Sequence, residues 1–346
     1  MIASVWRLLT RQILTNPAQD DTALREACEQ ARYGSDTEPA RRALAGTRGD
    51  HARRARYVRV LAASTAGGLG SRADKTTGRV DTEAAWADTW AARNPADPEA
   101  QLVRARSLLE RAWEVRGGGW ASTVRRDQWA EFARLADLAD QANDRAMALA
   151  PDDPTPWVTR LRTQIARSAP RESVDETWRE LTRRDPWHWE GHQLRLTHSC
   201  RKWSGSHEQM YGFARSVTAT APTGSPLHVL PVRAAAEWAL WEEDRAAPRR
   251  TAAEVEEQWR QDPVMQSDLD TALSRWFHQP GARHPDWYDD LNHLAYGLAR
   301  SGRDADAAPV FAAIGKFMTT TPWGWWGAGP NDVAFVRARA RARRAG

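Results

Sequence analysis

The clearest hydrophobic pattern in the chain lies between residues 185 and 222. Its apolar residues recur at i, i+3, i+4 and i+7, the spacing of one helical face, at Met210, Phe213, Ala214 and Val217. Ser206 and Gln209, three positions apart, predict a capping box at the start of this helix. Pro222 follows it and predicts its end.

A first helix is expected just before this one. Asp185 followed by Pro186 is a helix-start signal, because Asp accepts from free backbone N–H groups and proline at the first helical position needs no partner. The pattern therefore predicts a helix from about Pro186 to Ser199 and a turn at residues 203–205. The segment reads as helix, tight turn and helix, closed by proline.

The same reading extends over the rest of the chain. We expect two helices separated by Asn16-Pro17, a short helical piece within residues 34–50, a helix from 51 to 63 and a linker over 64–80. The expected domains are 1–80, an N-terminal helical region with linker; 81–330, a helical repeat domain; and 331–346, a basic C-terminal helix or tail.

Prolines recur in the central part of the sequence at a nearly constant spacing. The motifs Pro-Ala-Asp-Pro at 95–98 and Pro-Asp-Asp-Pro at 151–154 are near copies that each follow one expected helix and open another. Prolines at 151, 186 and 222 stand 35 and 36 positions apart. This is close to the 34-residue period of tetratricopeptide repeats.

Particular residues carry that resemblance. They are Trp157, six positions after Pro151; Phe213 and Ala214, shortly before Pro222; and Gly302, Ala307 and Phe311 within residues 291–322. On these residues the chain resembles a divergent tetratricopeptide-repeat protein over about residues 95–322. The segment at 201–215 is also similar to a group of bacterial repeat-like proteins with no assigned activity.

The resemblance implies an all-α fold of stacked antiparallel helix pairs, a tetratricopeptide-like solenoid. Its concave face would bind a peptide or another protein. The residues expected to line that groove are Trp157, Trp187, Trp189, His192, Trp203 and His207. Association of two copies of the chain remains open.

Composition changes this picture in two respects. The chain has 19 Trp, which we interpret as large core residues of stacked helices. Its net charge is +4, yet five Arg lie in the last ten residues, so the remainder carries −1. A near-neutral body argues against a nucleic-acid surface. We expect the basic C-terminus to be a frayed, solvated end, although it could contact RNA, acidic protein or anionic lipid.

The expected location is the bacterial cytoplasm. Cys28 and Cys200 are the only cysteines, so a disulfide framework is not expected. The N-terminus is apolar but interrupted by Arg7 and Arg11, which is typical of an amphipathic helix, and no run is long enough to span a membrane. The scarcity of Lys and abundance of Ala indicate a high-GC bacterial genome.

Histidines are concentrated in the 185–222 segment. His188 and His192 are four positions apart with Glu190 between them, and two imidazoles on one helical face can chelate a metal ion. The spacing is not the H-E-x-x-H of metalloproteases, and no second cysteine supplies a structural zinc pattern. Backbone or water hydrogen bonds at the rim of the groove are the alternative role, and we expect no metal or cofactor.

Two acidic clusters lie near aromatic residues. Glu243 follows Trp238 and Trp241, and Asp290 follows Trp287. Such carboxylates could hold Mg²⁺ for a diphosphate in an aromatic pocket, as in terpene cyclases. The sequence D-D-L-N-H lacks the third carboxylate of the D-D-x-x-D motif, so solvated helix ends are the alternative. An all-α enzyme or small-molecule binder is thus the second functional hypothesis, without a strong catalytic motif.

The densest aromatic cluster is P-W-G-W-W-G-A-G-P. Its Trp323, Trp325 and Trp326 are flanked by Gly and Pro, which predict a loop in place of a regular helix. The loop either caps the last helix pair or presents tryptophan, a residue enriched at interaction hot spots, to a partner.

Overall fold

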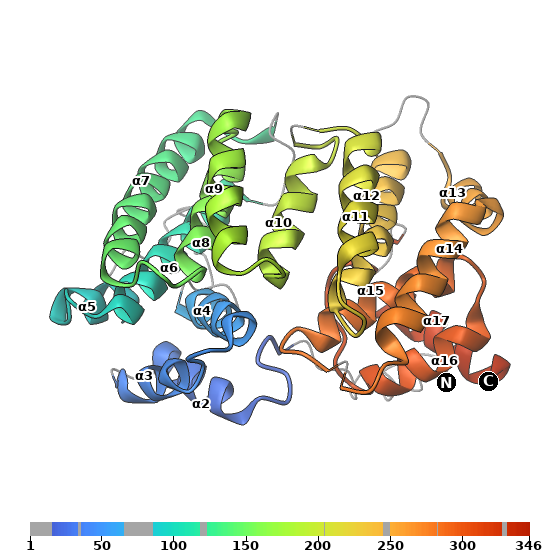
Figure 1. Ribbon diagram of the computed structural model, residues 1–346, viewed down its shortest axis with the longest axis horizontal. Coiled ribbons are helices and arrows are strands. Elements are labelled where there is room, and N and C mark those ends of the chain that lie inside the picture. Colours follow the sequence, from blue (N-terminus) through green and yellow to red (C-terminus); the bar gives the residue numbers. More distant parts are fainter. Residues whose placement is uncertain are drawn as a thin grey trace. The chain divides into compact units, whose positions relative to one another are not determined.

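The computed structural model describes residues 16–33, 36–65, 86–117, 123–203, 205–244, 250–281, 283–326 and 331–346. Those residues form helices and the turns between them, and no β-strand occurs among them (Figure 1). The expected all-α class is therefore confirmed. The expected first helix before Asn16 and most of the linker over 64–80 lie outside the described residues.

The chain divides into two compact units. Unit 1 comprises residues 1–19 and 195–346, and unit 2 comprises residues 20–194. This division does not follow the boundary expected near residue 80. The helix α4 (His51–Thr65), which we placed in the N-terminal region, packs within unit 2 against α6 (Pro98–Arg116) of the expected repeat domain.

Unit 2 is built from helices that mostly pack against their neighbours in sequence. Besides α4 and α6 it contains α2 (Thr22–Tyr33), α3 (Glu38–Ala45), α5 (Trp86–Arg93), α7 (Arg126–Leu149), α8 (Thr155–Ala166), α9 (Arg171–Arg184) and the first half of α10 (Trp189–Ser199). Helix α6 packs along α7, α7 on α8, and α8 on α9. Helix α4 also reaches α8, a contact between helices distant in sequence.

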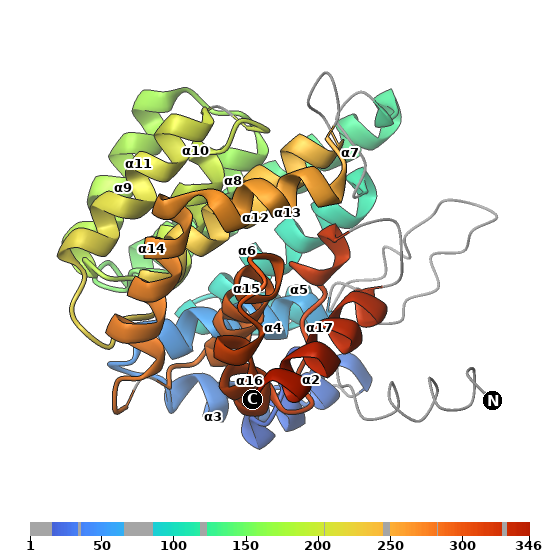
Figure 2. The ribbon, with the colours of Figure 1, turned by 90° about the vertical axis from the view of Figure 1, so that its right-hand side faces the viewer.

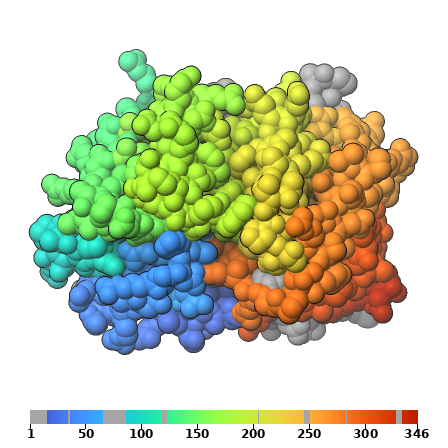
Figure 3. All heavy atoms as spheres, viewed as in Figure 1, coloured from blue at the N-terminus to red at the C-terminus, as the bar shows by residue number. Residues whose placement is uncertain are grey.

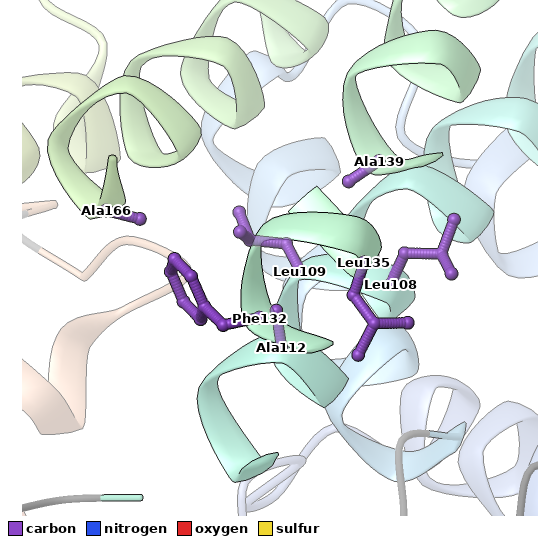
Figure 4. Close-up of a cluster of buried hydrophobic side chains, with 7 residues drawn as sticks. All are labelled: Leu108, Leu109, Ala112, Phe132, Leu135, Ala139 and Ala166. Carbon is purple, nitrogen blue, oxygen red and sulfur yellow. The ribbon is translucent and has the colours of Figure 1, made fainter. Parts of the chain in front are cut away.

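The core between α6, α7 and α8 shows why the predicted stripes form helices. The apolar residues recur on one face of each helix and meet in one buried cluster, which comprises Leu108, Leu109, Ala112, Phe132, Leu135, Ala139 and Ala166 (Figure 4). Trp113 and Trp129 lie edge-on to Phe132 at its margin, with ring centroids 5.5 Å away in each case. Small Ala residues allow the helices to approach closely around these large rings.

Unit 1 contains the remaining helices. They are α11 (His207–Thr220), η2 (Pro226–Val229), α12 (Leu230–Asp244), α13 (Ala252–Gln261), α14 (Pro263–Ala272), η3 (Leu273–Phe277, a π-helical turn), α15 (Trp287–Arg300), α16 (Asp304–Ile314), η4 (Trp323–Trp325) and α17 (Asn331–Ala345), together with the end of α10. Helix α11 packs on α12, and α12 also contacts α14 and α15. As predicted, Ser206 caps α11: its Oγ accepts from Gln209 N at 3.1 Å.

The basic C-terminus is not a frayed end. It forms α17, which packs on α15 and α16 (Figure 2). Phe335, Ala338 and Ala342 face the core and are fully buried. Arg339 donates to Gly315 O at 3.0 Å, and Arg341 donates to Ala299 O at 3.1 Å. Of the helix and the tail that the sequence allowed here, the structure has the helix, and its buried residues Phe335, Ala338 and Ala342 are three and four positions apart, on one helical face.

None of the helices in the described part of the chain is long and apolar enough to cross a membrane.

Candidate functional site

The start of α10 differs from the prediction. Asp185 was expected to cap a helix beginning at Pro186, but α10 begins at Trp189. Asp185 Oδ1 instead accepts from Trp187 N at 3.1 Å and closes a short turn. The turn rotates the chain so that His188 becomes the residue that precedes the helix.

His188 takes over the capping role. Its ring Nδ1 accepts from the backbone N–H of Gly191 at 3.3 Å, the bond that Ser or Asn makes at an ordinary N-cap. Because Nδ1 accepts, the hydrogen of the neutral ring resides on Nε2. The side chain is buried, with 1% exposed. Gly191 suits this position since a Cβ there would lie 2.5 Å from Leu181 Cδ2 of α9.

His192 lies one turn further along α10. Its Nδ1 donates to the carbonyl of His188 at 3.0 Å, and its ring meets the edge of Trp178 with centroids 4.9 Å apart. Trp187 lies nearly parallel to this ring, with centroids 6.3 Å apart and an interplanar angle of 20°. Burial lowers the pKa of His192 to about 4, so its ring is neutral near pH 7.

Trp187 is the one tryptophan of the described residues that is exposed to solvent, at 39%. We name Trp187, His192 and Trp178 the Trp187 platform. All three lie in unit 2. The α9–α10 segment from which they come is green to yellow-green in Figure 3. Sequence reasoning identified Trp187 and His192 but missed Trp178, which a helical stripe on α9 with Val174 and Leu181 could have indicated.

The other expected groove residues have different surroundings. Trp189 is buried beneath the guanidinium of Arg59, whose Cζ lies 5.6 Å from the ring centroid. Trp157 is half-buried and covered by Arg184 at 4.5 Å. Trp203 and His207 belong to unit 1. Within unit 2 the structure thus brings Trp187 and His192 together, while Trp189 and Trp157 each lie under an arginine side chain.

A chain of alternating charges lies next to the platform, inside unit 2. Glu190 Oε2 accepts from Arg59 at 2.9 Å, and its Oε1 accepts from Arg106 at 2.8 Å. Arg106 also donates to Glu110 at 2.9 Å, and Glu110 accepts from Arg162 at 3.3 Å. The chain joins α4, α6, α8 and α10, so four helices are connected through two carboxylates.

The electrostatics of Glu190 follow from this arrangement. Burial alone would raise its pKa, but Arg106 and Arg59 together lower the pKa to about 2. Arg106 is only 2% exposed, so both charges depend on each other for compensation. Glu190 is therefore a structural anion, and its position between His188 and His192 does not make it a free ligand.

In unit 1, the second half of α12 collects several predicted residues. His207 meets the edge of Trp241 with centroids 6.3 Å apart, and its Nε2 lies 3.8 Å from Glu242. Lys202 pairs with Glu237 at 2.6 Å and lies over Trp325 at 5.2 Å. Burial lowers the pKa of His207, so its ring is neutral near pH 7, and Lys202 is the positively charged partner of the two.

Glu243 is paired in the same region. It accepts from Arg300, a fully buried guanidinium on α15 that also donates to Tyr296 Oη at 2.8 Å. Arg300 lies among three aromatic rings, with Cζ 5.4 Å from the centroid of Trp326 and 5.8 Å from that of Trp259. The aromatic box near Glu243 is therefore occupied by the protein's own cation.

The aromatic loop begins inside the core. Trp323 is fully buried, and its Nε1 donates to Asn292 Oδ1 at 2.8 Å. It packs edge-on against Phe335 of α17 with centroids 5.2 Å apart. Trp325 and Trp326 are half-buried under Lys202 and beside Arg300. Of the two roles considered, these contacts describe a cap on the last helices.

Asp290 is also paired with neighbouring side chains. It is fully buried and accepts from Arg233 Nε at 2.9 Å, with His284 Nε2 at 3.0 Å. His293 Nδ1 donates to Asp289 O at 2.9 Å, which leaves its Nε2 to accept from Arg233 at 3.3 Å. Burial lowers the pKa of His293 to about 4. The single basic lone pair of the neutral His293 ring, on Nε2, is thus occupied by Arg233.

The described residues contain no group of three His, Cys, Asp or Glu side chains placed to hold a metal ion. A shallow depression of about 510 Å³ lies on α13, and neither Glu243 nor Asp290 lines it. Two of its carboxylates form hydrogen bonds in helix caps: Glu254 in the cap of α13, and Asp262 in the cap of α14. This depression offers no free carboxylate set for a cation.

Comparison with known proteins gives no further guide: no family model matches the chain, and no curated protein or solved structure matches it.

Proposed function

We propose that this protein is a non-catalytic scaffold that binds a peptide or protein segment, with the Trp187 platform as its contact point. In this proposal the helices form tetratricopeptide-like pairs, and the protein acts in the bacterial cytoplasm. Consecutive helices that pack on each other, such as α6 with α7 and α8 with α9, support the helix-pair arrangement.

One observation carries the binding role. Trp187 is solvent-exposed while every other described tryptophan is buried or half-buried, and its ring rests on a neighbour that cannot move freely. His192 is fixed by the carbonyl of His188 and by Trp178. A rigid, exposed indole loses little conformational entropy on binding and is typical of interaction hot spots.

The alternative, an enzyme with a metal–diphosphate pocket, receives less support. Glu243 and Asp290, the carboxylates it would use, are engaged by the buried Arg300 and the largely buried Arg233. Releasing either one would leave a guanidinium without its partner in the interior, which is strongly unfavourable.

Selection from a random peptide phage library on the immobilised full-length protein tests the proposal. Selected peptides should bind the Trp187→Ser variant at least about 30-fold more weakly, since a hot-spot truncation costs about 2 kcal/mol or more. The matched control is Val264→Ser, which removes an exposed apolar side chain (47% exposed) from α14 of unit 1 and should leave affinity unchanged. Equal affinity of the selected peptides for wild type and for Trp187→Ser would show that the Trp187 platform is not the contact point.

A further inference from the structure

The cap of α10 is chemically unusual, because its acceptor is a titratable ring. Gly191 N–H donates to His188 Nδ1, so the bond exists only while Nδ1 holds a lone pair. In the imidazolium form both ring nitrogens carry hydrogens. The two N–H groups would then face each other and the cap would be lost. Ser, Thr, Asp and Asn caps keep an acceptor at neutral pH and do not behave in this way.

The charged groups around His188 offer little compensation for a proton. The groups that face it are Asp185 and His51, Glu190 and His192 on α10, and Asp153. Asp185 already holds Trp187 N and lies 3.4 Å from His51 Nδ1.

The remaining two carboxylates are paired as well. Asp153 accepts from Arg54 at 2.6 Å, and Glu190 accepts from Arg59 and Arg106. No carboxylate among the groups named is without its own cation or N–H donor. Burial accordingly lowers the pKa of His188 below its usual 6.5, although Asp185 and Glu190 act in the opposite direction.

The cap and the Trp187 platform are linked through the backbone of His188. The carbonyl of His188 accepts both the backbone N–H of His192 at 3.1 Å and its ring Nδ1 at 3.0 Å. Trp187 precedes the cap directly and lies against that same ring. Opening the first turn of α10 would therefore remove the support on which the exposed indole rests.

We propose that His188 is a pH-sensitive cap that holds the Trp187 platform in place when neutral and releases it when protonated. The regulatory role rests on the binding function proposed above, whereas the capping role does not. Because the pKa of His188 is lowered in the folded turn, the folded turn resists protonation. The cap is therefore fully effective above about pH 6.5, and it weakens as the pH falls from there towards the folded pKa.

Native-state hydrogen exchange of the full-length protein between pH 5 and 7.5 tests the cap without any ligand. The protection factor of the Gly191 amide, corrected for intrinsic exchange, should fall by up to about tenfold for each pH unit below 6.5. In His188→Asn it should stay level, because Asn caps without titrating. The core amide of Leu109 should keep its protection throughout. The comparison is made in a His192→Gln background, because His192, whose folded pKa is lowered to about 4, would add a pH dependence of its own if opening released its ring.

Two further variants complete the design. His188→Ala should lose Gly191 protection at every pH, and His278→Asn, at an exposed histidine of unit 1, should behave as wild type. Equal protection profiles for wild type and His188→Asn would overturn the cap. If that difference is seen but library-selected peptides bind wild type equally at pH 7.5 and 5.5, the coupling to the platform is overturned. If no peptide depends on Trp187 at any pH, the binding function fails while the exchange data still decide the cap.

Discussion

Replacing Glu190 by Gln tests whether the buried charge chain holds unit 2 together. The two carboxylate oxygens face different guanidiniums, Arg106 at 2.8 Å and Arg59 at 2.9 Å. An amide keeps one acceptor, but its NH₂ group must then point a donor at a donor. The substitution also removes the negative charge that faces both guanidiniums, and one of them, that of Arg106, is only 2% exposed.

The expected loss of stability in Glu190→Gln can be obtained in two ways. Removing one partner of a buried ion pair costs about 3–5 kcal/mol. The pKa of Glu190 falls from 4.5 to about 2, and this shift corresponds to about 3 kcal/mol of stabilisation of the charged form. Because the folded pKa is lowered, the contribution is complete above pH 4.5 and is lost as pH falls from 4.5 towards 2.

Urea unfolding followed by circular dichroism measures this loss. At pH 7 Glu190→Gln should lower the free energy of unfolding by about 3–4 kcal/mol, and the difference from wild type should shrink below pH 4.5. Glu131→Gln is the control, because Glu131 pairs with an exposed Arg134 at 2.6 Å and such surface pairs contribute about 0–1 kcal/mol.

A double-mutant cycle with Arg106→Met separates the pair from its surroundings. The coupling between Glu190 and Arg106 should exceed about 1 kcal/mol, as it does for residues in one network. A loss below 1 kcal/mol for Glu190→Gln at pH 7, or a loss that does not change between pH 7 and pH 3, would refute the reasoning.

Three further substitutions test the contacts of unit 1. Arg300→Met should destabilise the protein by about 3–5 kcal/mol in chemical denaturation, because Glu243 loses its buried partner; a neutral effect would mean that solvent already compensates that carboxylate. Trp323→Phe should lower stability by about 2–4 kcal/mol by thermal unfolding, since it leaves a cavity and an unsatisfied Asn292 oxygen, and an unchanged melting temperature would contradict the capping role of the loop. Thr251→Ala should cost about 1 kcal/mol through loss of the α13 cap, with Ser at this position restoring most of it; equal stability of the Ala and Ser variants would argue against the cap.

Local signals in the sequence were sufficient for most helix boundaries. Asp97 and Pro98 open α6, with the Asp97 carboxylate accepting from Glu99 N at 3.0 Å, and Ser206 opens α11. Such caps involve residues two or three positions apart, so the sequence contains everything they need. The start of α10 is an exception: Asp185 Oδ1 accepts from Trp187 N in a short turn, and the helix begins at Trp189, three residues after the predicted start at Pro186.

The candidate site was only partly visible in the sequence. The i, i+4 spacing suggested two metal ligands on one helix, whereas His188 precedes α10 and caps it, and His192 lies within α10 and supports Trp187. The lone pair of a ring nitrogen can bind a metal ion or accept a hydrogen bond, so the residue type does not distinguish a metal ligand from a helix cap. Which role a ring nitrogen takes depends on the acceptors and donors that the neighbouring helices bring to it.

The residue pattern was sufficient to predict an all-helical chain and several helix ends, such as those before Pro151, Pro186 and Pro222. The pairing of Glu190 with Arg106 and Arg59, which are 84 and 131 positions away, could be seen only in the folded chain. The same holds for Trp187, which is 39% exposed while the other described tryptophans are buried or half-buried. Helix formation depends on hydrogen bonds and side chains within one turn, which neighbouring residues specify. Ion pairing and exposure depend on which distant surfaces meet, and a linear pattern of residue types does not encode that directly.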